Sequence, residues 1–133
     1  MEYPQIYADF VLSCQQDHLE EISEALSLQP TRVQTADQIL IEEYKGYHWI
    51  LSTEKQHSGD TSEQLEEITG QLAGKTKILQ ELIKKYGLEA LLGATVTVED
   101  SCDDVMGLIV SKKVIDFAAA IGAEVNMGVY VDS

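Results

Sequence analysis

The chain has 133 residues, and its 23 acidic and nine basic side chains give a net charge of −14 at pH 7. Nucleic acids and anionic membranes are recognised mainly by Lys and Arg, so we expect neither as a partner. No stretch approaches the ~20 apolar residues that span a bilayer, and the N-terminus lacks a basic, apolar leader. With two cysteines outside any CxxC pair, the expected location is the cytoplasm, with both thiols reduced.

Hydrophobic periodicity predicts a series of strands and helices within one domain, residues 1–133. In the first strand, at 6–14, one set of alternating residues forms a buried face, and Leu19, Ile22 and Leu26 share one face of a short helix. A tight turn at Lys45–Gly46 joins the strands of a hairpin. The predicted order is a strand at 6–14, the short helix, an irregular segment at 31–38, hairpin strands at 39–44 and 47–53, and a polar loop at 54–60.

The longest predicted helix begins at residues 60–62 and ends at Gly87, a position where glycine readily terminates a helix. Gly70 and Gly74 lie inside it and mark a kink, a break or close packing against the sheet, alternatives that the sequence leaves open. The remaining elements are a strand at 90–98, an acidic turn at 99–104, an apolar strand at 105–110, a helix from Ser111 to Gly122 and a strand at 125–131.

The order β-α-β-β-α-β-β-α-β indicates an α+β fold with a mixed or antiparallel sheet and helices mainly on one face. Its first six elements follow the ferredoxin-like order, and the last three extend it. If the other face is uncovered, its aromatic and threonine side chains form a contact surface for a protein partner or a second copy of the chain. The residues expected there are Tyr7, Val11, His48, Ile50, Thr95, Thr97 and Tyr130.

Negative charge is concentrated in the first half of the chain. Residues 1–74 hold 14 acidic side chains against three basic ones, a net charge of −11, whereas residues 75–133 have a net charge of −3. This asymmetry indicates either a surface that attracts a basic partner or one that only keeps the protein in solution. The glutamates expected to contact such a partner are Glu20, Glu21, Glu24, Glu42, Glu43, Glu63, Glu66 and Glu67.

No motif indicates catalysis or a cofactor. The chain has no glycine-rich phosphate loop, and Cys14, His18 and Cys102 lack the spacing of zinc ligands. The acidic turn at 99–104 lacks the regular spacing of oxygen ligands that a calcium-binding loop has. We therefore predict no catalytic residue, no metal and no cofactor, and we expect the single arginine, Arg32, to form a structural ion pair.

The opening strand and helix lead to Pro30-Thr31-Arg32, the segment HWILST contains a Trp-x-x-Ser strand, and IGAEVNMGVYVDS forms a closing helix end and strand. In these three segments the chain resembles the bacterial "domain of unknown function 4279" family. The resemblance implies a fold class and no established activity. Because many members look like small proteins from toxin-associated gene neighbourhoods, it also raises the role of an immunity protein.

The leading hypothesis is a non-enzymatic, acidic binding module that masks a basic partner protein, as an immunity or inhibitor protein does. Its carboxylates would speed association with a cationic surface, and apolar contacts would set the lifetime of the complex. The alternatives are a domain that senses a small ligand and a structural homodimer held through the open sheet face.

Overall fold

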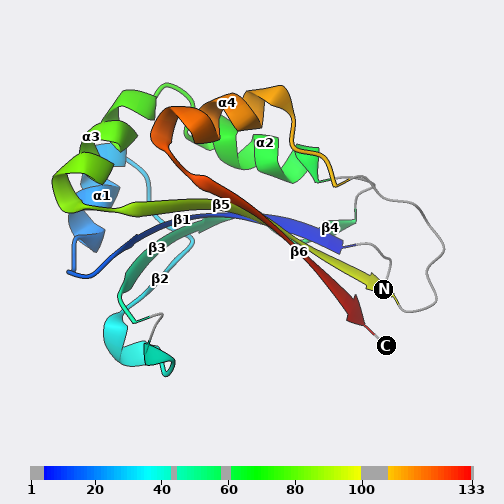
Figure 1. Ribbon diagram of the computed structural model, residues 1–133, viewed down its shortest axis with the longest axis horizontal. Helices are drawn as coiled ribbons and strands as arrows, with labels where there is room; N and C mark the ends of the chain where they lie inside the picture. The colour runs from blue at the N-terminus through cyan, green and yellow to red at the C-terminus, as the bar shows by residue number, and fades with distance from the viewer. Residues whose placement is uncertain (1–4, 43–44, 58–60, 100–107, 133) are drawn as a thin grey trace.

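The computed structural model describes residues 5–42, 45–57, 61–99 and 108–132, which form a sheet layer and a helix layer (Figure 1). The strands are β1 (Gln5–Cys14), β2 (Arg32–Gln34), β3 (Tyr47–Ser52), β4 (Gln56–His57), β5 (Glu89–Glu99) and β6 (Glu124–Asp132). The helices are α1 (Leu19–Leu26), α2 (Ser62–Gln71), α3 (Thr76–Tyr86) and α4 (Lys112–Ile121), with a 3-10 turn η1 (Ala36–Gln38). The predicted α+β fold class is confirmed.

The sheet is mixed, with the strand order β2-β3-β1-β5-β6, and the short β4 also pairs with β1. β1 runs antiparallel to β3, β4 and β5, whereas β6 runs parallel to β5 after the crossover through α4. Leu12 of β1 lies opposite Trp49 of β3 and Ala90 of β5. Because residues that lie opposite one another point to the same face, the alternation in β1 extends its buried face across the neighbouring strands.

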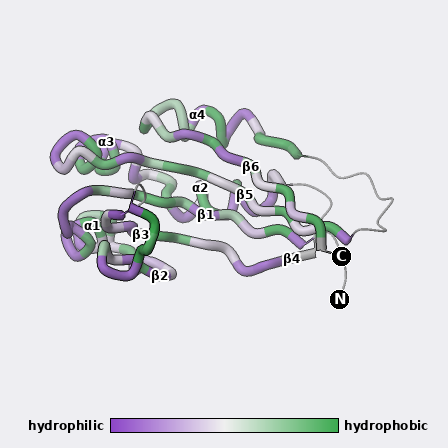
Figure 2. The backbone as a smooth tube through the Cα atoms, turned by 60° about the horizontal axis from the view of Figure 1, so that its bottom comes forward, coloured by the Kyte–Doolittle hydropathy of each residue, from purple (hydrophilic) through white to green (hydrophobic). Residues whose placement is uncertain are grey.

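The four helices cover this buried face of the sheet (Figure 1). α2 packs against β1 and β5, α1 packs against β3 and α3, and α4 packs against α2 and α3. The ring of Phe117 on α4 meets the ring of Phe10 edge to face, with 6.2 Å between the centroids. Trp49 is fully buried in this core. Hydrophobic stretches run along the strands beneath these helices (Figure 2).

The predicted segment boundaries around β2 are wrong. Residues 32–34, expected to be irregular, form a strand that pairs with β3, and residues 36–38 form η1. Residues 39–42, expected to begin the hairpin, are not in a strand, and residues 43–44 lie outside the described part of the chain. The three residues of β2 are too few to show an alternating pattern, so the sequence alone did not indicate a strand. They form one because they pair with β3. Residues 56–57, expected in a loop, pair with β1 as β4.

The long predicted helix is two helices, so a break is the alternative that the structure shows. α2 ends at Gln71, and α3 begins at Thr76. Between them Gly74 has a φ of +79°, a left-handed conformation that a helix interior does not accommodate. The break gives the two short helices different neighbours, since α2 packs against β1, β5 and α4, and α3 packs against α1 and α4. No helix in the described part of the chain has the length and apolar character needed to cross a membrane.

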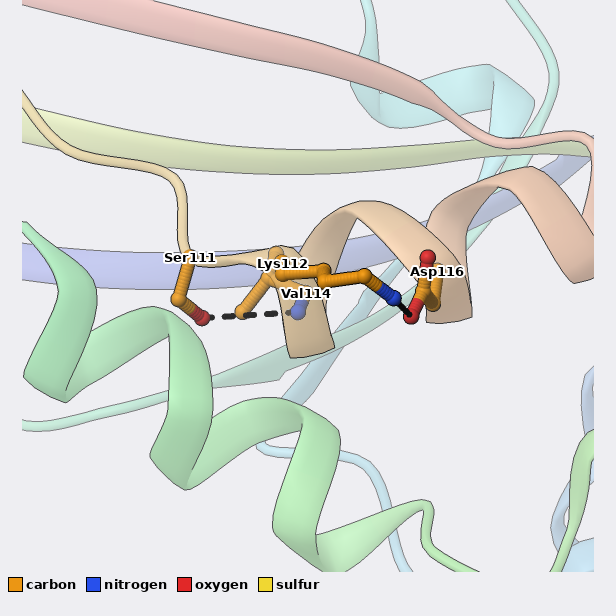
Figure 3. A network of polar contacts seen from close by, with 4 residues as sticks. All are labelled: Ser111, Lys112, Val114 and Asp116. Atoms are coloured by element: carbon orange, nitrogen blue, oxygen red, sulfur yellow. Dashed lines mark hydrogen bonds and ion pairs between the residues drawn. The ribbon is translucent and has the colours of Figure 1, made fainter.

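The segment before α4 also differs from the prediction. Residues 108–110, expected in a strand, are not in one, and residues 105–107 lie outside the described part of the chain. α4 begins at an N-cap, Ser111, whose hydroxyl accepts a hydrogen bond from the backbone N–H of Val114 at 3.5 Å (Figure 3). One turn into the helix, Nζ of Lys112 lies 2.8 Å from Oδ2 of Asp116. These contacts hold the first turn of α4.

Candidate functional site

A groove of about 930 Å³ lies between the outer face of α1 and the segment that leads into β2. Figure 1 and Figure 2 place both elements at the same end of the molecule. The residues that line the groove are Asp17, Leu19, Glu20, Glu21, Ser23, Glu24, Gln29, Pro30 and Val33. Four of them are carboxylates, and the lining residues include no basic side chain.

The amphipathic pattern of α1 sets the orientation of its carboxylates. Ile22 and Leu26 are fully buried against the core, which leaves Glu20, Glu21 and Glu24 exposed on the other side of the helix. Ser23 fixes the helix to the sheet, because its hydroxyl accepts a hydrogen bond from Nε1 of Trp49 at 2.9 Å. Glu20 and Glu21 lie in the first turn, where their negative charge also complements the helix dipole. The acidic face is therefore carried by an anchored helix.

The opposite side of the groove ends in an edge of the sheet. β2 pairs with β3 along one side, and its other side is not paired within the described residues. Val33 in the middle of β2 is 42% exposed and, with Leu19 and Pro30, gives the groove apolar surface. Carboxylates, apolar surface and the backbone groups of an open strand edge thus lie together. Such an edge can accept an additional strand from another chain.

The structure separates the eight glutamates that the sequence analysis grouped. Glu20, Glu21 and Glu24 line the groove, whereas those of α2 do not. On α2, Glu63 and Glu67 are exposed and Glu66 is half-buried. Glu42 lies beyond η1, which Figure 1 places on the other side of the sheet, and its carboxylate is 3.2 Å from Nζ of Lys45. Glu43 lies outside the described residues.

Asp17 belongs to the acidic groove but was absent from that group of glutamates. It precedes α1, and its Oδ1 accepts a hydrogen bond from the backbone N–H of Leu19 at 3.2 Å. Together with Glu20, Glu21 and Glu24 it has the spacing i, i+3, i+4, i+7, which continues the line of these glutamates just beyond the start of the helix. This spacing is the signal by which sequence reasoning could have found it.

The open face of the sheet carries the residues expected there, but in separate groups, and Ile50 is buried rather than uncovered. The register places Tyr7, Thr95 and Tyr130 near one end of the face, with Tyr130 62% exposed. His48 lies opposite Ser13 near the other end of β1, and its Nδ1 is 2.7 Å from the Ser13 hydroxyl. Six residues of strand, about 20 Å, separate the two ends, so His48 does not share a contact patch with the two tyrosines.

Arg32 begins β2 and is exposed. The ion pairs between described residues are Lys45 with Glu42 and Lys112 with Asp116. The structural ion pair predicted for Arg32 is not among them, because the register places Arg32 opposite Ile50, on the sheet face away from Trp49, where its side chain is exposed.

Cys14 ends the buried face of β1 and is 6% exposed. Its thiol donates a hydrogen bond to the backbone carbonyl of Gln16 at 2.8 Å. Burial raises the pKa of the Cys14 thiol above its ordinary value, which disfavours the nucleophilic thiolate. Cys102 lies outside the described residues. Within the described ranges, no three His, Cys, Asp or Glu side chains are grouped so as to hold a metal ion.

Comparison with known proteins identifies a family but no individual related protein. The sequence profile of the family described as "Domain of unknown function (DUF4279)" matches residues 4–132. No curated protein and no solved structure matches the chain. The profile match spans every strand and helix described above, so this protein belongs to the DUF4279 family.

Proposed function

We propose that the protein is a non-enzymatic binding module whose acidic groove holds a cationic, extended segment of a partner protein. The observation that supports this most directly is the groove itself. Asp17, Glu20, Glu21 and Glu24 line one hollow, and none of them takes part in the two ion pairs of the described residues. A partner would supply the positive charge that this groove lacks.

Each part of the groove has a separate task in this proposal. The carboxylates attract Lys and Arg side chains and speed association, an effect that salt screens beyond a Debye length of about 8 Å at physiological ionic strength. Leu19, Pro30 and Val33 contact the apolar parts of the bound segment. The open edge of β2 pairs with its backbone, which selects an extended conformation over a helical one.

Binding of this kind would mask the cationic surface of the partner. A protein that acts on an anionic substrate, such as a nuclease, presents such a surface, and occupying it prevents the substrate from binding. The role of an inhibitor or immunity protein follows from this arrangement when the partner is a toxin.

The test compares two triple variants of equal charge. The groove variant carries Glu20→Gln, Glu21→Gln and Glu24→Gln. The control variant carries Glu63→Gln, Glu67→Gln and Glu81→Gln, three exposed positions on α2 and α3 outside the groove. Binding of a fluorescent nine-residue peptide of alternating Lys and Thr is measured by anisotropy at 50 and 300 mM NaCl.

The groove variant is expected to bind the peptide more weakly than the unmodified protein by roughly 3- to 150-fold, the product of three exposed charge pairs. The control variant is expected to lose much less, because its changed charges are distant from the peptide. Equal losses in both variants would show that net charge alone attracts the peptide. Failure to bind at 50 mM NaCl would also refute the proposal.

A further inference from the structure

A second hollow, of about 170 Å³, lies on the sheet face that the four helices leave uncovered (Figure 1). Its centre is Gly93 of β5. The register aligns a row of residues across four strands, with Ser52 opposite Asp9, Asp9 opposite Gly93, and Gly93 opposite Asn126. Because Gly93 has no side chain, the middle of this row is open.

The walls of the hollow follow from the same register. Leu91 and Thr95 are the neighbours of Gly93 on the same face of β5, and Val11 lies opposite Leu91. At the β6 side, the ring of Tyr130 folds back over Gly128. A Cβ built on Gly128 would lie 3.3 Å from Cε2 of Tyr130, so this second glycine makes room for the ring. The exposed tyrosine ring thereby forms the outer wall.

Asp9 is the charged residue among those that line the hollow. It is half-buried, and its carboxylate accepts a hydrogen bond from the Ser52 hydroxyl, which holds the side chain in place. Neither ion pair of the described residues involves Asp9. Lys55 is directed elsewhere, with its Nζ 5.7 Å from the centre of the Tyr7 ring. A fixed carboxylate therefore borders the hollow without a cation from the described part of the chain.

We propose that this hollow is a binding site for a small organic cation, a primary amine attached to a short apolar or aromatic body. The ammonium group would lie over Gly93, between the Asp9 carboxylate and the amide oxygen of Asn126. The strands that carry these two residues, β1 and β6, flank β5 and are about 9.6 Å apart. Val11 and Leu91 would contact the body of the ligand, and the Tyr130 ring would stack against it.

The dimensions of the hollow limit the ligand. Its volume equals that of roughly six water molecules in the liquid, which restricts the bound part to fewer than about ten non-hydrogen atoms. A fragment of this size that uses one charged contact and one ring is expected to have a Kd on the order of 1 mM. The site lies on the opposite side of the sheet from α1, so this inference does not depend on the proposed function of the acidic groove.

The test is an NMR titration of the ¹⁵N-labelled protein with benzylamine and with benzyl alcohol, which has the same shape but no charge. Benzylamine is expected to shift the amide signals of Asp9, Gly93 and Thr95 and to reach saturation. Benzyl alcohol is expected to bind at least about tenfold more weakly, because it cannot pair with the carboxylate.

Two variants locate the site. Asp9→Asn keeps an oxygen for the Ser52 hydroxyl but removes the charge, and it is expected to reduce benzylamine binding to the level of benzyl alcohol. Gly93→Ala is expected to weaken binding of both probes strongly, because its Cβ would occupy the centre of the hollow, where the ammonium group is placed, and would lie 3.2 Å from the carbonyl oxygen of Asn126. Gly70→Ala is the matched control, since a Cβ there meets no atom within 4 Å.

Three results would overturn the inference. They are equal binding of benzylamine and benzyl alcohol, full benzylamine binding by Asp9→Asn, or benzylamine shifts confined to α1. If Gly93→Ala fails to fold, Tyr130→Ala replaces it, because this residue is exposed and its loss is expected to weaken binding about tenfold. Unchanged binding by that variant would likewise contradict the site. The groove variant is expected to bind benzylamine normally, which separates this test from that of the proposed function.

Discussion

The same substitution, glycine to alanine, is expected to change stability in opposite directions at two positions four residues apart. Gly70 lies inside α2, and a Cβ built there meets no heavy atom within 4 Å. Glycine destabilises a helix interior by about 1 kcal/mol relative to alanine, so Gly70→Ala is expected to stabilise α2 by up to that amount. The gain is smaller because Gly70 lies in the last turn of the helix. Gly74 has a φ of +79°, and alanine adopts the left-handed conformation at a cost of about 1–2 kcal/mol.

Thermal unfolding followed by circular dichroism measures both effects. An unfolding entropy of about 2.1 cal/mol/K per residue means that 1 kcal/mol shifts the Tm of a chain of this length by roughly 3–4 °C. Gly70→Ala is therefore expected to raise Tm by roughly 1–4 °C, and Gly74→Ala to lower it by roughly 3–7 °C. An increase in Tm with Gly74→Ala would mean that one helix continues through this position, and the break between α2 and α3 would be wrong.

Four further experiments test other parts of the structure. Ser23→Ala leaves the buried Nε1–H of Trp49 without its acceptor and is expected to cost about 1–3 kcal/mol in urea unfolding; an unchanged midpoint would contradict the hydrogen bond. In a Cys102→Ser background, Cys14 is expected to react with a thiol reagent at least tenfold more slowly than in the unfolded chain, and rapid labelling of the native protein would contradict its burial. Because burial raises the pKa of the Cys14 thiol, the unfolded chain loses the thiol proton at a lower pH than the folded protein does. The free energy of unfolding is therefore expected to decline as pH rises above about 8.5, and a Cys14→Ala variant should lose that part of the pH dependence. Lys113→Glu places a negative charge in the first turn of α4 and is expected to raise Tm by about 1–3 °C, whereas a decrease would count against the helix start at Ser111.

The candidate site was predictable in part. The spacing of Glu20, Glu21 and Glu24 placed them away from the buried face of a helix, because Ile22 and Leu26 marked that face. The groove itself was not predictable, because its second side is the edge of the sheet at Val33. A three-residue strand forms there by pairing with β3, and no local pattern signals that contact. The open-face hollow has the same origin, since it needs Asp9, Gly93 and Asn126 to meet across three strands.

By itself the sequence determined the long strands β1, β5 and β6, the helices α1 and α4, and the α+β class. Side-chain alternation and helical spacing are local properties, and the burial of one face makes them visible along the chain. Only the tertiary structure decided that the long predicted helix breaks near Gly74, that β2 forms the sheet edge, and that Glu42 lies apart from the glutamates of α1. The physical reason is that these features depend on which distant segments pair and pack. The stability of such non-local contacts cannot be inferred from the pattern of residues within one short segment.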